Sequence, residues 1–268
     1  SEMCIRDRSL INRDDTRAPK SAVYGGVPRQ RVSSQSWKRA IRKYFETHVD
    51  AESVGDRSKR IPEKIALKVE DHEGWDAERA QAAVAGLFKS AGITTEVDSK
   101  KLKALKESEE TTQEELKAAQ YQQTKYLLFL SPHQIDRAAA AIVEADGEKI
   151  SKKDAQKILD TEHSVDMALF GRMVADDAAF NIDASVQVAH ALGIHASAPE
   201  FDYFTAVDDL AEEGQETGAG MIGTVQMMSS TLYRYATVNL SGLSKNLDSE
   251  ENAKQAAVDF VDAFIKSM

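Results

Sequence analysis

The chain has 268 residues, of which 42% are hydrophobic and 29% charged, a balance typical of one globular domain or two small ones. Its net charge of −10 argues against a surface that binds nucleic acid everywhere. No apolar run approaches the roughly 20 residues of a membrane helix, the charged start lacks a secretory signal, and one cysteine excludes an internal disulfide, so we expect a cytoplasmic protein without membrane partners.

Basic residues are concentrated near the start of the chain. From Ser9 to Lys43, nine basic residues stand against two acidic ones, Asp14 and Asp15, so this stretch carries a charge of +7. A local basic stretch on an acidic body favours directed binding of a polyanion. The alternative is a solvated basic face without a ligand, and composition alone favours that alternative.

The first fifty residues predict one strong helix. Residues 1–8 show neither strand alternation nor a helical face, and we expect them to be a non-native leader. Residues 9–31 contain two prolines and a Gly-Gly pair, which predict a loop. Serines at 33, 34 and 36 can cap a helix, and apolar residues then recur at helical spacing over residues 35–48.

The rest of the chain predicts mixed helices and strands. Residues 62–119 are charged, poor in Gly and Pro, and helical in composition. We expect strands at 126–130, 165–173 and 232–240 from their apolar, β-branched or alternating residues. We expect helices at 133–145, 151–159, 180–193 and 249–266. Residues 195–230 are rich in glycine and predict a long loop or a hairpin.

The predicted helix at 35–48 carries a basic face. At about 100° per residue, four polar side chains share one arc opposite the stripe of Trp37, Ile41 and Phe45. Cations near the free N–H groups of a helix start favour phosphate binding. The alternative is the ordinary charged side of an amphipathic helix. The four side chains are Gln35, Lys38, Arg39 and Arg42.

Motifs for catalysis or cofactors are weak. Two Asp-Asp pairs, at 14–15 and 208–209, could hold a divalent metal, but neighbouring acids in sequence do not face one another, and we favour a structural role. The glycine pattern at 218–223 lacks a preceding hydrophobic strand, so we reject a dinucleotide site. His190 and His195 are five apart and fit no metal motif. We therefore expect no cofactor, no metal and no enzyme.

Three successive motifs resemble a known family: Leu-Ile-Asn-Arg-Asp-Asp at 10–15, Tyr-Gly-Gly at 24–26 and Arg-Val-Ser-Ser-Gln-Ser-Trp-Lys-Arg-Ala at 31–40. Further motifs follow in the family's order at 126–131, 165–173, 204–210 and 232–236. The chain resembles the CasC family, the repeated backbone subunit of Cascade, the guide-RNA complex of type I-E CRISPR systems.

The resemblance implies an α+β fold shaped like a hand. Its palm would be a modified RNA-recognition-motif sheet of ferredoxin-like topology, formed by residues 9–60, 120–194 and 229–268. Residues 61–119 would form a helical fingers insertion and residues 195–228 a thumb hairpin. The family has a first strand before residue 10 and further palm strands after the last helix, so we expect a fragment that is incomplete at both ends.

The resemblance also assigns roles to residues. Gly171, Arg172 and Met173 would bind the guide RNA, with Met173 against a base near a kink. The thumb would contain Phe204, Asp208 and Asp209. Ser33, Gln35, Lys38 and Arg39 would contact guide-RNA phosphates. The other RNA-binding residues would be Arg42 on the same face, Lys20 in the preceding loop, and Arg13.

The implied function is binding of CRISPR guide RNA without catalysis. Copies of the chain would line up along the RNA beside other Cascade subunits and present it to a target DNA strand. Two alternatives stay open: a metal-dependent ribonuclease of a related CRISPR effector, which the Asp-Asp pairs would serve, and an RNA-recognition-motif protein unrelated to CRISPR.

Overall fold

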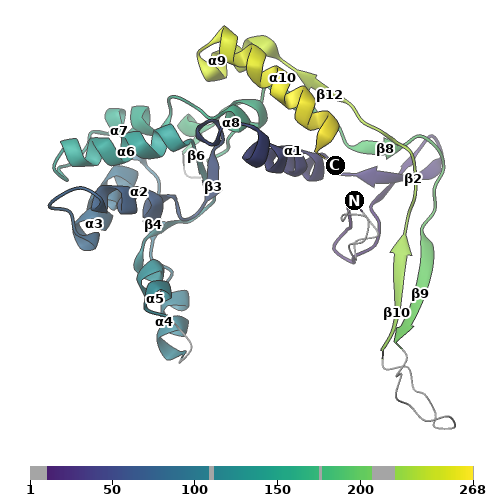
Figure 1. Cartoon of the computed structure of the whole chain (residues 1–268), viewed down its shortest axis with the longest axis horizontal. Helices are drawn as coiled ribbons and strands as arrows, with labels where there is room; N and C mark the ends of the chain where they lie inside the picture. The colour runs from purple at the N-terminus through teal and green to yellow at the C-terminus, as the bar shows by residue number, and fades with distance from the viewer. Residues whose placement is uncertain (1–10, 109–111, 175–176, 207–220, 268) are drawn as a thin grey trace. The chain divides into compact units, whose positions relative to one another are not determined.

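A computed structural model describes residues 11–108, 112–174, 177–206 and 221–267 (Figure 1). The chain divides into two compact units. Unit 1 comprises Ser1–Ala40 and Val188–Thr237, and unit 2 comprises Ile41–Gln187 and Val238–Met268. The boundary falls within helix α1 (Ser34–His48), which the sequence predicted. Helices combined with small antiparallel sheets confirm the predicted α+β class.

Unit 1 contains a four-stranded antiparallel sheet with the strand order β1-β2-β8-β11. A two-residue turn joins its first two strands, and both turn residues, Gly25 and Gly26, have positive φ angles of 65° and 79°. Such a turn matches the twist of a hairpin. The loop predicted for residues 9–31 is therefore wrong from residue 21 onward, because the glycines turn a hairpin. The strands are β1 (Ser21–Tyr24), β2 (Val27–Val32), β8 (Ala191–Gly193) and β11 (Leu232–Tyr233).

A second hairpin in unit 1 is formed by β9 (Glu200–Ala206) and β10 (Met221–Met227), which confirms the hairpin predicted within residues 195–230. Gly223 pairs with Phe204 across the hairpin. A Cβ atom at Gly223 would lie 2.3 Å from the Phe204 ring, so in its present position the ring packs directly on the glycine. Gly223 thus has a packing role inside a strand, unlike a phosphate-binding glycine.

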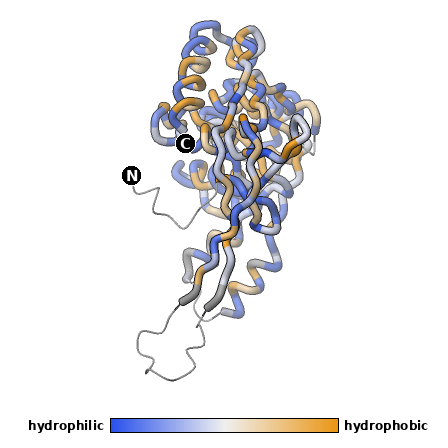
Figure 2. Tube along the Cα trace, turned by 90° about the vertical axis from the view of Figure 1, so that its right-hand side faces the viewer, coloured by the Kyte–Doolittle hydropathy of each residue, from blue (hydrophilic) through white to orange (hydrophobic). Residues whose placement is uncertain are grey.

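Unit 2 has a hydrophobic core between helices α2 (Ile61–Glu70), α3 (Ala77–Ala91), α6 (Pro132–Glu144) and α7 (Lys152–Leu159). Figure 2 shows hydrophobic and hydrophilic residues alternating along the helical parts of the chain, as expected where one face of each helix is buried. These helices confirm the predictions for 62–119, 133–145 and 151–159 within the described residues. The shorter elements are α4 (Ser99–Glu107), α5 (Gln113–Gln120), β3 (Asp56–Ser58) paired with β6 (Leu128–Leu130), and β4 (Thr95–Glu96) paired with β5 (Gln123–Thr124).

Side-chain caps fix the starts of several unit 2 helices. Ser131 and Gln134 form a reciprocal capping box at α6, with Pro132 in the first turn. Ser249 caps α10 (Glu250–Lys266), which confirms the helix predicted at 249–266. Helix α9 (Leu240–Leu247) precedes it.

Within the described ranges, no helix has the length and apolar character needed to cross a membrane.

Two predicted elements are wrong. Residues 165–173 do not form a strand: Ser164 precedes helix α8 (Val165–Phe170). The alternation of polar and apolar residues in the sequence had suggested a strand with one exposed and one buried face. Residues 166–169 are instead all buried, so this alternation does not correspond to two such faces. Residues 180–193 do not form a helix, because strand pairing competes with helix propensity there. They contain the end of a 3₁₀ turn, η3 (Ala178–Phe180), followed by β7 (Val186–Val188) and β8.

The strand predicted at 232–240 is divided into two short strands, β11 and β12 (Ala236–Val238). A further 3₁₀ turn, η2, spans Ala51–Ser53.

Candidate nucleic-acid interface

Ser33 fixes the start of helix α1. Its Oγ accepts a hydrogen bond from the backbone N–H of Ser36 at 3.3 Å, and its own N–H donates to Asn12 Oδ1 at 3.0 Å. Ser33 is only 5% exposed. The hydroxyl that we predicted on a phosphate is therefore engaged as a helix cap and is nearly buried.

Trp37 packs the first turn of α1 within unit 1. Its side chain is buried, and the guanidinium carbon of Arg234 lies 3.5 Å from the centroid of the Trp37 ring. A cation over an indole face is attractive. Burial lowers the pKa of Arg234 from its usual value. Arg234 was not among the predicted site residues, although its position between Tyr233 and Tyr235 in a predicted strand could have indicated a side chain pointing toward the helix.

Gln35, Lys38 and Arg39 form the part of the predicted basic face that is available to a ligand. Gln35 and Arg39 are exposed and Lys38 is partly exposed. Within the described part of the chain, no carboxylate lies at ion-pair distance from Lys38 or Arg39. The helix therefore presents two cations whose charge is not neutralised locally, next to an exposed amide that can hydrogen-bond to phosphate.

Arg42, the fourth member of that face, is used inside unit 2. Its Nε donates to Asp166 Oδ2 at 3.1 Å, and its guanidinium carbon lies 4.7 Å from the Phe129 ring centroid. The Asp166 side chain is completely buried and Arg42 is 24% exposed. This ion pair gives Arg42 a structural role that periodicity alone could not reveal.

The segment before β1 holds Arg13 and Lys20. Arg13 forms a bridge with Pro19, and its Nη1 donates to the carbonyl of Arg17 at 2.8 Å. Lys20 is partly exposed, and its backbone carbonyl accepts a hydrogen bond from Arg31 N–H at 2.9 Å. Both lie in unit 1, as do Gln35, Lys38 and Arg39.

Asp14 has a local role. Its Oδ1 accepts hydrogen bonds from the Thr16 hydroxyl at 2.7 Å and from the N–H groups of Thr16 and Ala18. The Thr16 hydroxyl is the main cause of the lowered pKa of Asp14. Among the described residues, no three His, Cys, Asp or Glu side chains converge as metal ligands. Asp208 and Asp209 lie outside the described residues.

The predicted trio at the end of α8 belongs to unit 2. Gly171 has φ +79°, and a Cβ there would lie 2.7 Å from the carbonyl oxygen of Ile182. Arg172 is buried, although the resemblance places it on RNA: it pairs with Asp160 and donates to the Phe180 carbonyl at 2.8 Å. It thus holds the fold together. Met173 is 79% exposed, a position open to a ligand.

The β9–β10 hairpin presents aromatic side chains. Phe201 and Tyr203 alternate along β9 and are exposed, so they share one face of the hairpin. Phe204, which we predicted in the thumb, lies on the opposite face against Gly223. The strands therefore offer rings on both faces.

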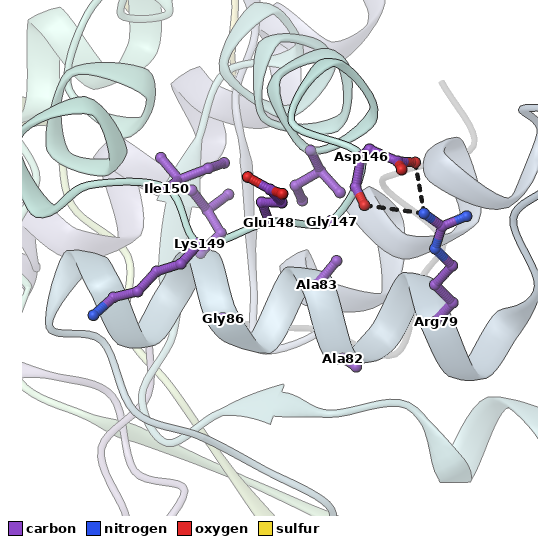
Figure 3. Close-up of a pocket in the computed structure, with 11 residues that line it drawn as sticks. Arg79, Ala82, Ala83, Gly86, Asp146, Gly147, Glu148, Lys149 and Ile150 are labelled. Atoms are coloured by element: carbon purple, nitrogen blue, oxygen red, sulfur yellow. Dashed lines mark hydrogen bonds and ion pairs between the residues drawn. The ribbon is translucent and has the colours of Figure 1, made fainter.

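A separate cavity in unit 2 involves no predicted site residue. It has a volume of about 310 Å³ and lies between α3 and residues 146–150. Figure 3 shows these loop residues beside Ala82, Ala83 and Gly86, with Arg79 reaching Asp146 at one end. Arg79 Nη2 donates to Asp146 Oδ1 at 2.6 Å. Because this cation is already paired, the cavity does not add to the candidate interface.

Solved structures resemble this chain over nearly its whole length. One, described as "CRISPR RNA-guided surveillance complex, pre-nicking", has 33% sequence identity and a TM-score of 0.72, and the match covers 95% of this chain and 68% of that chain. Another, "CRISPR RNA-guided surveillance complex", has 28% identity and a TM-score of 0.64, covering 97% and 68%. No curated protein matches the sequence. The family model described as CT1975-like protein matches residues 6–268, and the chain belongs to this family.

Proposed function

We propose that this chain binds guide RNA as a non-catalytic subunit of a CRISPR surveillance complex. The observation that carries the proposal is the 33% identity, over 95% of the chain, to a chain of a CRISPR RNA-guided surveillance complex. Two cations at the start of α1, Lys38 and Arg39, have no ion-pair partner among the described residues. They support the proposal, because backbone contacts with little sequence preference suit a guide that varies in sequence.

The finer proposal is a backbone subunit of a type I-E Cascade of the CasC kind. Copies of the chain would line up along the guide RNA next to other subunits and leave its bases free to pair with a target DNA strand. The palm would have an RNA-recognition-motif topology, residues 61–119 would be the fingers, and the β9–β10 hairpin would belong to the thumb. Met173 would contact a base, and Gln35, Lys38 and Arg39 would contact phosphates.

A gel shift with labelled single-stranded RNA tests this function. The change Lys38→Glu/Arg39→Glu should weaken binding and reduce the slope of log affinity against log salt by about 1.4, since each phosphate contact on a single strand contributes about 0.7. Lys152→Glu/Lys153→Glu is a matched control, because it makes the same charge change at two exposed positions of unit 2. Equal affinity of the Lys38/Arg39 variant and the wild type would contradict the assignment.

The same samples test catalysis. With magnesium or manganese present, we expect the RNA to stay intact. Shortened RNA would instead favour the metal-dependent ribonuclease. A strong preference for particular short sequences would favour a general RNA-recognition protein.

A further inference from the structure

Gly86 is the one glycine of the described ranges that the folded chain does not explain. It lies in the middle of helix α3, where glycine destabilises a helix relative to alanine. Its φ angle is not positive, and apart from its own helix and chain neighbours no atom lies within 4 Å of the position that a Cβ would take. Every other described glycine has either a positive φ or an atom within 3.1 Å of that position.

Gly86 lines the cavity of about 310 Å³ between α3 and residues 146–150, which we call the α3 groove. Figure 3 shows the small residues of α3 along one side of it and the loop residues opposite. Because a Cβ at Gly86 would meet no atom, glycine keeps open a space that a larger residue would fill. The apolar residues that line the α3 groove are Ala82, Ala83, Gly86, Leu87, Ile142 and Ile150.

Contacts within unit 2 hold the loop beside α3. Arg79 Nη2 donates to the Asp146 carbonyl at 2.9 Å, in addition to its bond with the Asp146 carboxylate. Gly147 has φ +80°, and a Cβ there would lie 3.2 Å from the ring of Trp75, which is nearly buried. The α3 groove is therefore formed before any partner binds, so binding requires little reordering of the loop.

The charge around the α3 groove is uneven. At the end marked by Arg79, four exposed carboxylates surround that single cation, which gives a net charge of −3. Lys149 extends toward the opposite end (Figure 3). No ion pair joins Glu148 to another of the described residues, so its charge is available to a ligand. The four carboxylates are those of Glu78, Glu144, Asp146 and Glu148.

We propose that the α3 groove docks a segment of a partner protein in which a large apolar side chain stands beside arginine or lysine. The apolar lining accepts the apolar side chain, and glycine permits the close approach of the partner backbone. The carboxylates attract the neighbouring cation and repel phosphate groups, so a nucleic acid is a poor occupant. This docking uses none of the residues proposed to contact guide RNA.

Selection from a library of random peptides displayed on phage, with the full chain as target, tests the proposal. The counter-target is Gly86→Leu, because leucine fills the groove. Peptides that bind only the wild type should share an apolar residue beside arginine or lysine. The synthetic peptide should bind Gly86→Leu about tenfold more weakly or worse, the loss expected when a buried leucine-sized side chain loses its contacts. Glu148→Lys should weaken binding by about two- to fivefold.

Gln81→Leu is the matched control, since it places leucine on the same helix outside the α3 groove, and it should keep the affinity. Gly86→Leu should unfold at or above the wild-type midpoint, because leucine favours the helix and meets open space. A lower midpoint would show that the fold itself needs the glycine and would overturn the proposal. So would the absence of discriminating peptides, or an acidic consensus among them.

Two further measurements on Gly86→Leu separate this docking from the other functions of the chain. The variant should bind single-stranded RNA as the wild type does, and its sedimentation should show unchanged self-association. Weakened RNA binding or lost self-association would assign the α3 groove to RNA or to a second copy and overturn the proposal. Failure of the Lys38/Arg39 variant to weaken RNA binding would count against the proposed function and not against this groove.

Discussion

Replacing Arg42 with methionine would leave the Asp166 carboxylate buried without its cation. The Asp166 side chain has no exposed surface, and apart from Arg42 its hydrogen-bond donors are the backbone N–H groups of Gly55, at 2.9 Å, and Met167. Removing one partner of a buried ion pair costs about 3–5 kcal/mol. Because Arg42 retains 24% exposure, we expect the lower end, about 3 kcal/mol. For a protein of this size that corresponds to a fall in Tm of about 6–12 °C.

Urea denaturation and thermal unfolding followed by circular dichroism would measure this change. Lys43→Met is the matched control, since Lys43 pairs with Glu46 on the same helix and both side chains are exposed. Such a pair is worth about 0.5 kcal/mol or less. The affinity of folded Arg42→Met protein for single-stranded RNA should stay within about twofold of the wild type, because Asp166 already neutralises this cation. An unchanged unfolding midpoint together with weakened RNA binding would refute the structural role of Arg42.

Three further outcomes follow from the structure. Arg172→Met should destabilise unit 2 by about 3–5 kcal/mol in urea, because it leaves a carboxylate and several buried carbonyls without their donor; a stable variant with weak RNA binding would restore the RNA assignment. Gly171→Ala should cost about 2 kcal/mol, seen as a lower unfolding midpoint, because its φ of +79° and a carbonyl 2.7 Å from the new Cβ both oppose a side chain. Hydrogen bonds from Lys266 and Tyr44 lower the pKa of Asp262 below 3.8, so this group stabilises the fold above about pH 4 and loses that contribution as the pH falls; Asp262→Asn should flatten the acid limb of the unfolding midpoint, and an unchanged limb would contradict the linkage.

Helices that depend on local signals could be predicted from the sequence. Ser131 and Ser249 stand directly before long periodic segments, and both cap the helices expected there. The stripe of Trp37, Ile41 and Phe45 is buried as predicted. In these helices the capping residue and the first apolar residues of the buried face lie within one or two helical turns of each other. Local sequence is therefore enough to predict the helix, without knowledge of distant contacts.

Elements that depend on distant contacts could not be predicted. Helix α8 contains the buried Asp166, whose partners Arg42 and Gly55 lie more than a hundred residues earlier in the chain. When those partners are unknown, an aspartate among apolar residues is expected to be exposed to solvent, so the sequence predicts an exposed position for a residue that is buried. The strand β8 is short and gains its hydrogen bonds from β2 and β11, so its own residues carry little β signal.

The cations of α1 differ in whether they already have a partner in the folded chain. Periodicity places Lys38, Arg39 and Arg42 on one arc, and the structure separates them by their partners: Arg42 has a buried carboxylate, whereas no carboxylate of the described residues pairs with the other two. A cation already paired in the folded chain gains less from a phosphate, since binding must replace an existing ion pair. The expected contribution to RNA affinity therefore lies with Lys38 and Arg39. The same criterion excludes Arg172, which is buried and paired with Asp160 although the resemblance grouped it with the RNA contacts.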